Sequence, residues 1–170
     1  LEKTAQLKPD LIEMDIQETK DGQFVMMHDA NLRGLAGLNK TPQDLTLEEL
    51  QQIDIHENGH TTKISSFDDY LNRANELHQK LLIEIKTSHK DSPQMMDHFL
   101  EKYAAKIKVY GHQMQSLDYH VVEKVTQYDK DIPIYFILPY NSVFPRTNAT
   151  GYTMEYSTLR QGYELNHRQG

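Results

Sequence analysis

From residue 64 onward, segments with the apolar period of a helix alternate with short apolar runs typical of strands. Helices are predicted from Ser66, from Ser92 and over residues 119–128, each with its apolar side chains along one stripe. Strands are predicted over residues 81–86, 107–114, 132–138 and 152–155. Strands that alternate with helices form βαβ units, in which successive strands run parallel. The alternation therefore predicts the α/β fold class with a mainly parallel sheet.

The first part of the chain adds a strand and a hairpin to this pattern. Residues 1–10 are predicted to be the tail of a helix, and residues 11–16 a strand with period-two alternation. Glu13 and Asp15 share one face of this strand, opposite its apolar side chains. The pair Asp21-Gly22 then predicts a tight turn into a return strand that ends at His28.

Residues 30–63 have a different composition, rich in turn-forming residues. One helix is predicted over residues 46–53, because Thr46 and Glu49 form a capping box. The segment has too few apolar residues for a core of its own. We therefore interpret residues 1–170 as a single domain, with residues 30–63 as an insertion within it.

Composition excludes several classes of protein. With 38% apolar and 25% charged residues, the chain is that of an ordered globular protein. Its 18 basic and 25 acidic residues give a net charge of −7, which disfavours a general nucleic-acid-binding surface but permits an acidic site that recruits a cation. The absence of cysteine excludes thiolate nucleophiles and cysteine-bound zinc. The sequence contains no apolar run long enough to span a membrane and no secretory signal.

Two predicted strands carry acidic residues that point the same way. Glu13 and Asp15 lie on one strand, and Glu84 and Lys86 share a face of another. Such acids are often merely solvated, but here they interrupt strands whose apolar neighbours indicate burial. Three carboxylates form an oxygen-rich set that suits Ca²⁺ or Mg²⁺ better than zinc, and Lys86 adds a charge that could hold a phosphate.

One histidine of the nine stands out by its position. His28 ends a strand and is followed by Asp29, which could orient its ring, and strand ends line the active face of parallel α/β folds. The other eight are interpreted as structural or exposed.

Several motifs together resemble the glycerophosphodiester phosphodiesterase family. They are Glu13-Met14-Asp15, Thr19-Lys20-Asp21-Gly22, Val25-Met26-Met27-His28-Asp29, Ile64-Ser65-Ser66-Phe67, Glu84-Ile85-Lys86 and Gln115-Ser116-Leu117-Asp118. Their order and intervals also match the family. The segment up to Asn58-Gly59-His60 is most similar to members carried as soluble domains of bacterial membrane proteins, in the cytoplasm or tethered to the membrane.

The resemblance implies a (β/α)8 TIM barrel with an insertion after its second strand. It implies hydrolysis of a small glycerophosphodiester to glycerol phosphate and an alcohol, with the glycerol 2-hydroxyl attacking phosphorus to give a cyclic phosphate that water opens. Glu13, Asp15 and Glu84 would then bind a divalent metal, Ca²⁺ or Mg²⁺, His28 would be one of two acid/base histidines, and Lys86 would contact phosphate. No nucleic acid is implied, and any membrane contact would come from segments outside the chain.

The chain departs from the family in two places. It has no His-Arg-Gly tripeptide, which supplies the family's other histidine and a phosphate-binding arginine, and it has no Trp for the late Trp-Thr strand end. Because a barrel of this class takes about 250 residues, we expect an incomplete barrel of five strands, cut from a longer protein. The chain by itself is then expected to be inactive. The alternatives are a non-catalytic cation- or phosphodiester-binding module and another metal-dependent barrel enzyme acting on phosphates.

Overall fold

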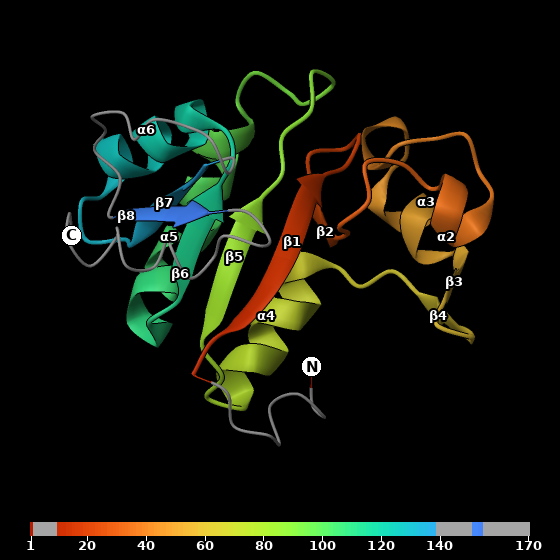
Figure 1. Cartoon of the computed structure of the whole chain (residues 1–170), viewed down its shortest axis with the longest axis horizontal. Helices are drawn as coiled ribbons and strands as arrows, with labels where there is room; N and C mark the ends of the chain where they lie inside the picture. The colour runs from red at the N-terminus through yellow and green to blue at the C-terminus, as the bar shows by residue number, and fades with distance from the viewer. Residues whose placement is uncertain (2–9, 139–150, 155–170) are drawn as a thin grey trace.

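The chain forms a six-stranded, mainly parallel sheet with helices packed against it, and a small lobe beside it (Figure 1). The computed structural model describes residue 1, residues 10–138 and the backbone of residues 151–154. The elements are β1 (Ile12–Glu18), β2 (Phe24–Met26), α2 (Arg33–Ala36), the 3-10 helix η1 (Pro42–Asp44), α3 (Leu47–Gln51), β3 (Asp54–Glu57), β4 (His60–Lys63), α4 (Phe67–Glu76), β5 (Leu81–Ile85), α5 (Met95–Tyr110), β6 (Gln113–Ser116), α6 (Tyr119–Tyr128), β7 (Ile134–Leu138) and β8 (Gly151–Met154). The predicted α/β class is confirmed.

The main sheet has the strand order β2-β1-β5-β6-β7-β8. The pairs β1–β5, β5–β6, β6–β7 and β7–β8 are all parallel, so the carboxyl ends of five strands meet at one edge. Strand β2 runs antiparallel to the last part of β1, from Ile16 opposite Met26 to Glu18 opposite Phe24. The hairpin predicted from Asp21-Gly22 is confirmed, and Gly22 has the positive φ of 74° that such a turn requires.

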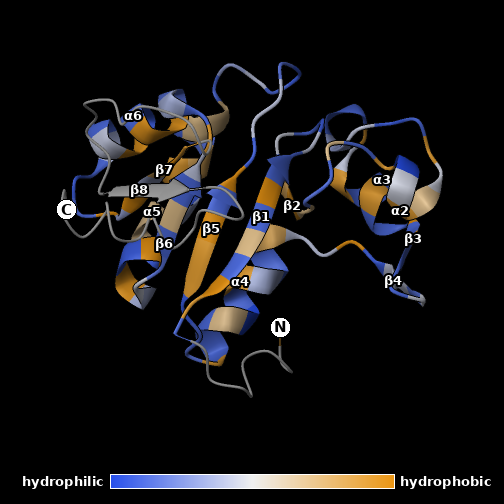
Figure 2. Cartoon of the chain, in the orientation of Figure 1, coloured by the Kyte–Doolittle hydropathy of each residue, from blue (hydrophilic) through white to orange (hydrophobic). Residues whose placement is uncertain are grey.

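The main core lies between this sheet and the three helices α4, α5 and α6. Apolar residues line β1 and β5 and the inner stripes of the helices (Figure 2). At its centre Phe67, Phe99 and Tyr103 form an aromatic cluster with ring centroids 4.8 to 5.8 Å apart, a geometry that adds to the burial of the rings. Since side chains alternate along a strand, the polar residues of β1 and β5 are left on the opposite face of the sheet.

Residues 30–63, which the sequence analysis interprets as an insertion, form the small lobe and contain more structure than the sequence predicts. The capping box of Thr46 and Glu49 is confirmed, although helix α3 is shorter than expected. Strands β3 and β4 form a hairpin whose turn is Asn58-Gly59, with φ of 51° and 76°. The sequence analysis did not predict this hairpin, whereas positive φ at both residues is the signature of a two-residue hairpin turn.

The lobe has an apolar cluster that it shares with its flanks. The buried members are Val25, Met27, Leu32, Leu50, Ile55 and Ile64. Three of these six lie outside residues 30–63. The cluster thus anchors the lobe to β2 and to the entry of α4, and this attachment holds the lobe beside the carboxyl end of β1.

Helix α5 corrects one predicted strand. Residues 107–114 were expected to be extended, but α5 continues to Tyr110 and β6 starts only at Gln113. Ile107 belongs to the buried stripe of the helix, four residues after Tyr103, and Gly111 ends the helix with a left-handed φ of 74°. At the other end α5 starts at Met95 rather than at Ser92, whose backbone N–H and hydroxyl both donate to Glu18 instead.

The other predicted helices and strands agree with the structure where it describes them. Helices α4 and α6 are confirmed, the former with Ser66 as its N-cap, and the strands over 81–86, 132–138 and 152–155 are found with slightly different bounds. The helix tail predicted over residues 1–10 lies almost wholly outside the described residues. Within the described part of the chain, none of the helices combines the length and the apolar character that a membrane crossing needs.

A buried histidine, His112, links helix α4 to the start of strand β5. His112 is 1% exposed; its Nε2 lies 2.6 Å from Asn75 Oδ1, and its Nδ1 accepts from the backbone N–H of Leu81 at 3.0 Å. Burial, helped by the nearby Lys80, lowers the pKa of His112 to about 4. The ring is therefore neutral in the folded protein at pH values where an unfolded histidine binds a proton.

This pKa predicts that stability falls as the solution is acidified from pH 6.5 towards 4, because only the unfolded chain takes up the proton there. Between pH 7.5 and 5, His112 should account for a loss of about 2 kcal/mol in the free energy of unfolding, measured by urea denaturation. The variant His112→Gln should lose that part of the pH dependence, whereas exposed His98→Gln should keep it. An unchanged pH slope in His112→Gln would contradict the assignment.

Candidate functional site

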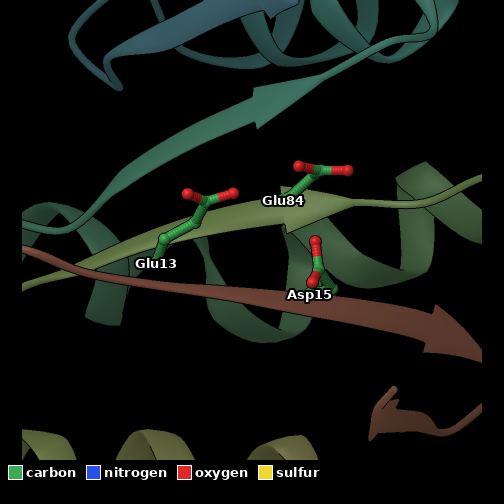
Figure 3. Close-up of side chains that lie close together, drawn as sticks. All are labelled: Glu13, Asp15 and Glu84. Carbon is green, nitrogen blue, oxygen red and sulfur yellow. The ribbon is translucent and has the colours of Figure 1, made fainter. Parts of the chain in front are cut away.

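Three carboxylates meet on the sheet face that the helices leave uncovered. The parallel register places Asp15 of β1 directly opposite Glu84 of β5, and Glu84 opposite Gln115 of β6. Glu13 lies two residues before Asp15 and so shares its face. One carboxylate oxygen from each of Glu13, Asp15 and Glu84 lies within 4.8 Å of the others. Figure 3 shows the three side chains close together on the neighbouring strands β1 and β5. The convergence predicted from the two strands is therefore present.

The cluster is electrostatically unfavourable by itself. Burial and the charges of Asp15 and Glu13 together raise the pKa of Glu84 to about 7, although Lys86 partly offsets them. The Nζ of Lys86 lies 3.7 Å from Glu84 Oε2. A group with positive charge that sits among the three acids would remove this repulsion.

Gln115 completes the floor of the cluster, and the sequence interpretation did not assign it a role. Its Nε2 donates to Glu13 Oε1 at 3.1 Å and to Glu84 Oε1 at 3.3 Å. Its Oε1 is buried and has no hydrogen-bond partner among the described residues. A buried amide oxygen without a partner is costly, whereas the amide nitrogen holds Glu13 and Glu84 in place through its two hydrogen bonds.

His28 lies at the rim of the same site, after strand β2. Its Nδ1 lies 3.3 Å from Asp29 Oδ1, and its side chain is 75% exposed. The cavity here has a volume of about 640 Å³, and its lining includes His28, Glu84, Lys86, Ser116 and Leu117. The structure thus places His28 and Lys86 on one cavity with a carboxylate of the cluster.

Gln17 holds the wall of this cavity in place and was also missed. Its Nε2 donates to the backbone oxygens of Met27 and Asp29 at 2.9 and 2.8 Å, and its Oε1 accepts from Gln43 in the insertion. Gln17 continues the period-two series of Glu13 and Asp15 on β1, which is the signal that could have found it. Because it bonds the segment that carries His28, it fixes that segment to the strand that carries the acids.

The donor set fits a hard divalent cation. The described residues that converge here offer only oxygen atoms, which Ca²⁺ and Mg²⁺ prefer, whereas zinc is usually held by histidine or cysteine. A cation bound here would lie near Lys86 and His28, at the carboxyl edge of the sheet where barrel folds place their active sites.

The chain belongs to the glycerophosphoryl diester phosphodiesterase family, whose sequence profile matches residues 1–158. Among curated proteins it is similar to YhdW of Bacillus subtilis (strain 168), which carries the name of a glycerophosphodiester phosphodiesterase. The two are 42% identical over 48 residues, which is 28% of this chain and a fifth (20%) of the relative.

Solved structures show the same fold. A glycerophosphodiester phosphodiesterase from Parabacteroides distasonis superposes with a TM-score of 0.75 at 18% identity, over 98% of this chain and 69% of that one. The Thermotoga maritima protein of the same name gives 0.69 at 19% identity, over 99% and 73%. An Oleispira antarctica phosphodiesterase, solved with sn-glycerol-3-phosphate, gives 0.68 at 16% identity, over 98% and 72%. The predicted TIM-barrel class is confirmed, with five parallel strands of the barrel in the described residues.

The repulsion within the cluster predicts the behaviour of Glu84→Gln. Because the pKa of Glu84 is about 7 in the folded chain and 4.5 in the unfolded chain, ionisation of Glu84 lowers the free energy of unfolding as the pH rises above 4.5. The full loss is reached above about pH 7. At pH 8 in EDTA, Glu84→Gln should therefore raise the free energy of unfolding by about 1 to 3 kcal/mol. Urea denaturation should show no such gain at pH 4.5, nor at either pH for exposed Glu101→Gln. A destabilised Glu84→Gln at pH 8 would mean that the carboxylate is already compensated without a cation.

Proposed function

We propose that this domain hydrolyses glycerophosphodiesters to glycerol phosphate and an alcohol, with a divalent cation held by Glu13, Asp15 and Glu84. The observation that carries the proposal is the convergence of the three carboxylates within 4.8 Å, beside a cavity lined by His28 and Lys86. Family membership supports the same reaction.

The acids would hold the cation at the floor of the site, and Gln115 would hold Glu13 and Glu84 in place. Ca²⁺ or Mg²⁺ bound there would balance the negative charge that develops on the phosphoryl oxygens. The raised pKa of Glu84 supports this role, because a positive charge among the acids relieves the repulsion that contributes to it.

Lys86 would bind a phosphate oxygen. Its ammonium group is 3.7 Å from Glu84, its side chain is 25% exposed, and it lines the cavity. The lysine thus supplies a fixed positive charge next to the cation, where a phosphodiester carries its negative charge.

His28 would exchange a proton with the substrate. Attack by the glycerol 2-hydroxyl needs a group to accept its proton, and departure of the alcohol oxygen needs a proton in return. His28 stands at the cavity rim with Asp29 to orient its ring. The family's second histidine belongs to His-Arg-Gly, a tripeptide that the 170 residues do not contain, so we expect the chain by itself to turn over slowly or not at all.

The alternative is a module that binds a cation or a phosphodiester without catalysis. The absence of the tripeptide favours the binding module. Expression of the chain within a longer reading frame, called the extended protein below, distinguishes the module from the enzyme. Turnover of glycerophosphocholine or glycerophosphoglycerol by the extended protein supports the enzyme, whereas cation binding without turnover supports the module.

The cation site is tested by Asp15→Asn, with Asp69→Asn on the exposed side of α4 as the matched control. Ca²⁺ or Mg²⁺ at a hundred times its dissociation constant should stabilise the wild-type chain by about 2.7 kcal/mol, seen as a rise in Tm by differential scanning fluorimetry. Asp15→Asn should lose most of that rise, and any hydrolysis by the extended protein should fall by at least about a hundredfold. A cation-dependent rise that survives Asp15→Asn would place the metal elsewhere.

A further inference from the structure

A second cavity adjoins the proposed active site on the side of the insertion. Its volume is about 620 Å³. It is formed by two parts of the chain, the segment from Ala30 to Asp44 and the loop that follows β5, residues 87–90. The ion pair of Lys90 with Asp44, at 3.1 Å, joins the two parts. The proposed mechanism makes no use of this cavity.

The lining of this cavity is basic although the chain as a whole has a net charge of −7. Arg33, Lys40 and Lys90 carry positive charge there, and Asp44 is the acid that faces them. Hydrogen bonds from the backbone of Thr41 and from Lys90 lower the pKa of Asp44 to about 2, so Asp44 stays ionised and is matched with Lys90. Asp44 therefore does not neutralise Arg33 or Lys40. Lys40 also interacts electrostatically with Glu49.

Arg33 is held in position without being neutralised. Its Nε and Nη2 donate to Oδ1 of Asn39 at 2.9 and 2.5 Å, and its backbone N–H donates to Asn31. Since an amide carries no charge, the guanidinium keeps its full charge and further N–H donors. Lys40 lines the same cavity, and the acid with which it interacts, Glu49, is not part of the lining. An oriented guanidinium with a lysine beside it is a typical receptor for phosphate or carboxylate.

The two cavities form neighbouring parts of one surface. Gln17, Ala30, Asn31 and Thr87 line both of them. A molecule whose phosphodiester lies by Lys86 can therefore extend past Asn31 and Thr87 towards Arg33 and Lys40. The proposed reaction requires the glycerol phosphate half of the substrate but leaves the alcohol half variable. We therefore take the alcohol to be the half that extends.

We propose that the cavity of Arg33 and Lys40 binds an anionic group on the alcohol half of the substrate, so that the preferred glycerophosphodiesters carry a second negative charge. This inference rests on the proposed function for the chemistry it extends. It makes Arg33 and Lys40 residues that determine specificity. It also predicts that glycerophosphodiesters whose alcohol has a cationic end, such as choline, are poor substrates here.

The experiment compares glycerophosphoglycerol with the same compound carrying a terminal phosphate monoester. In the extended, metal-loaded protein, kcat/KM should be about tenfold or more higher for the phosphorylated substrate at low ionic strength, and the preference should shrink with added salt. Lys40→Gln and Arg33→Gln should each lower this ratio several-fold, chiefly through KM. Lys40→Arg should restore it, and Lys130→Gln, an exposed lysine before β7, should leave it unchanged.

A binding measurement separates this inference from the proposed function. Calorimetric titration of the phosphorylated compound into the chain in EDTA should give binding that Lys40→Gln weakens and Lys130→Gln does not. Hydrolysis with the same substrate ratio in wild type and Lys40→Gln overturns the anionic subsite but leaves the function standing. Binding to the chain that depends on Lys40, without any hydrolysis by the extended protein, supports the subsite and overturns the function. Absence of both binding and hydrolysis refutes both.

Discussion

The parallel pairing of β1 with β5 is the constraint on which the rest of the structure depends. Its register sets Met14 opposite Ile83 on one face and Asp15 opposite Glu84 on the other. The first face packs against α4 and α5 and forms the core, whereas the second brings carboxylates together that repel one another. A single strand pairing thus places apolar residues in the core and brings three mutually repelling carboxylates together, and burial of the apolar face offsets the cost of the acidic face.

The insertion contributes to the site through a few hydrogen bonds and a shared apolar cluster. Gln17 connects β1 to the segment that carries His28 and, through Gln43, to the lobe. The apolar side chains of the lobe pack against Val25 of β2 and against Met27, which follows β2. The lobe is therefore fixed to the sheet by a shared apolar cluster. Because of this attachment, the basic side chains of the lobe stand next to the acidic floor of the barrel.

Charge is distributed locally rather than evenly. Acids lie on the sheet face, Lys86 lies beside them, and Arg33 and Lys40 lie one cavity away. A phosphodiester bound at the acidic floor through a cation would have its alcohol end near the basic cavity. The net charge of −7 says little about such a gradient, since the gradient depends on which side chains the fold brings together.

The sequence alone determined the local features. Period-two alternation placed Glu13 with Asp15 and Glu84 with Lys86, Asp21-Gly22 predicted the hairpin, and the motifs indicated the family, because these signals lie within a few residues of each other. Only the tertiary structure decided which strands are neighbours and in which register. Gln115 lies 102 residues from Glu13, and Lys90 lies 46 residues from Asp44, so no local pattern could reveal those contacts. The boundary between α5 and β6 was likewise misplaced, because Ile107 is equally apolar in a strand and in a helix, and its packing within α5 chose the helix.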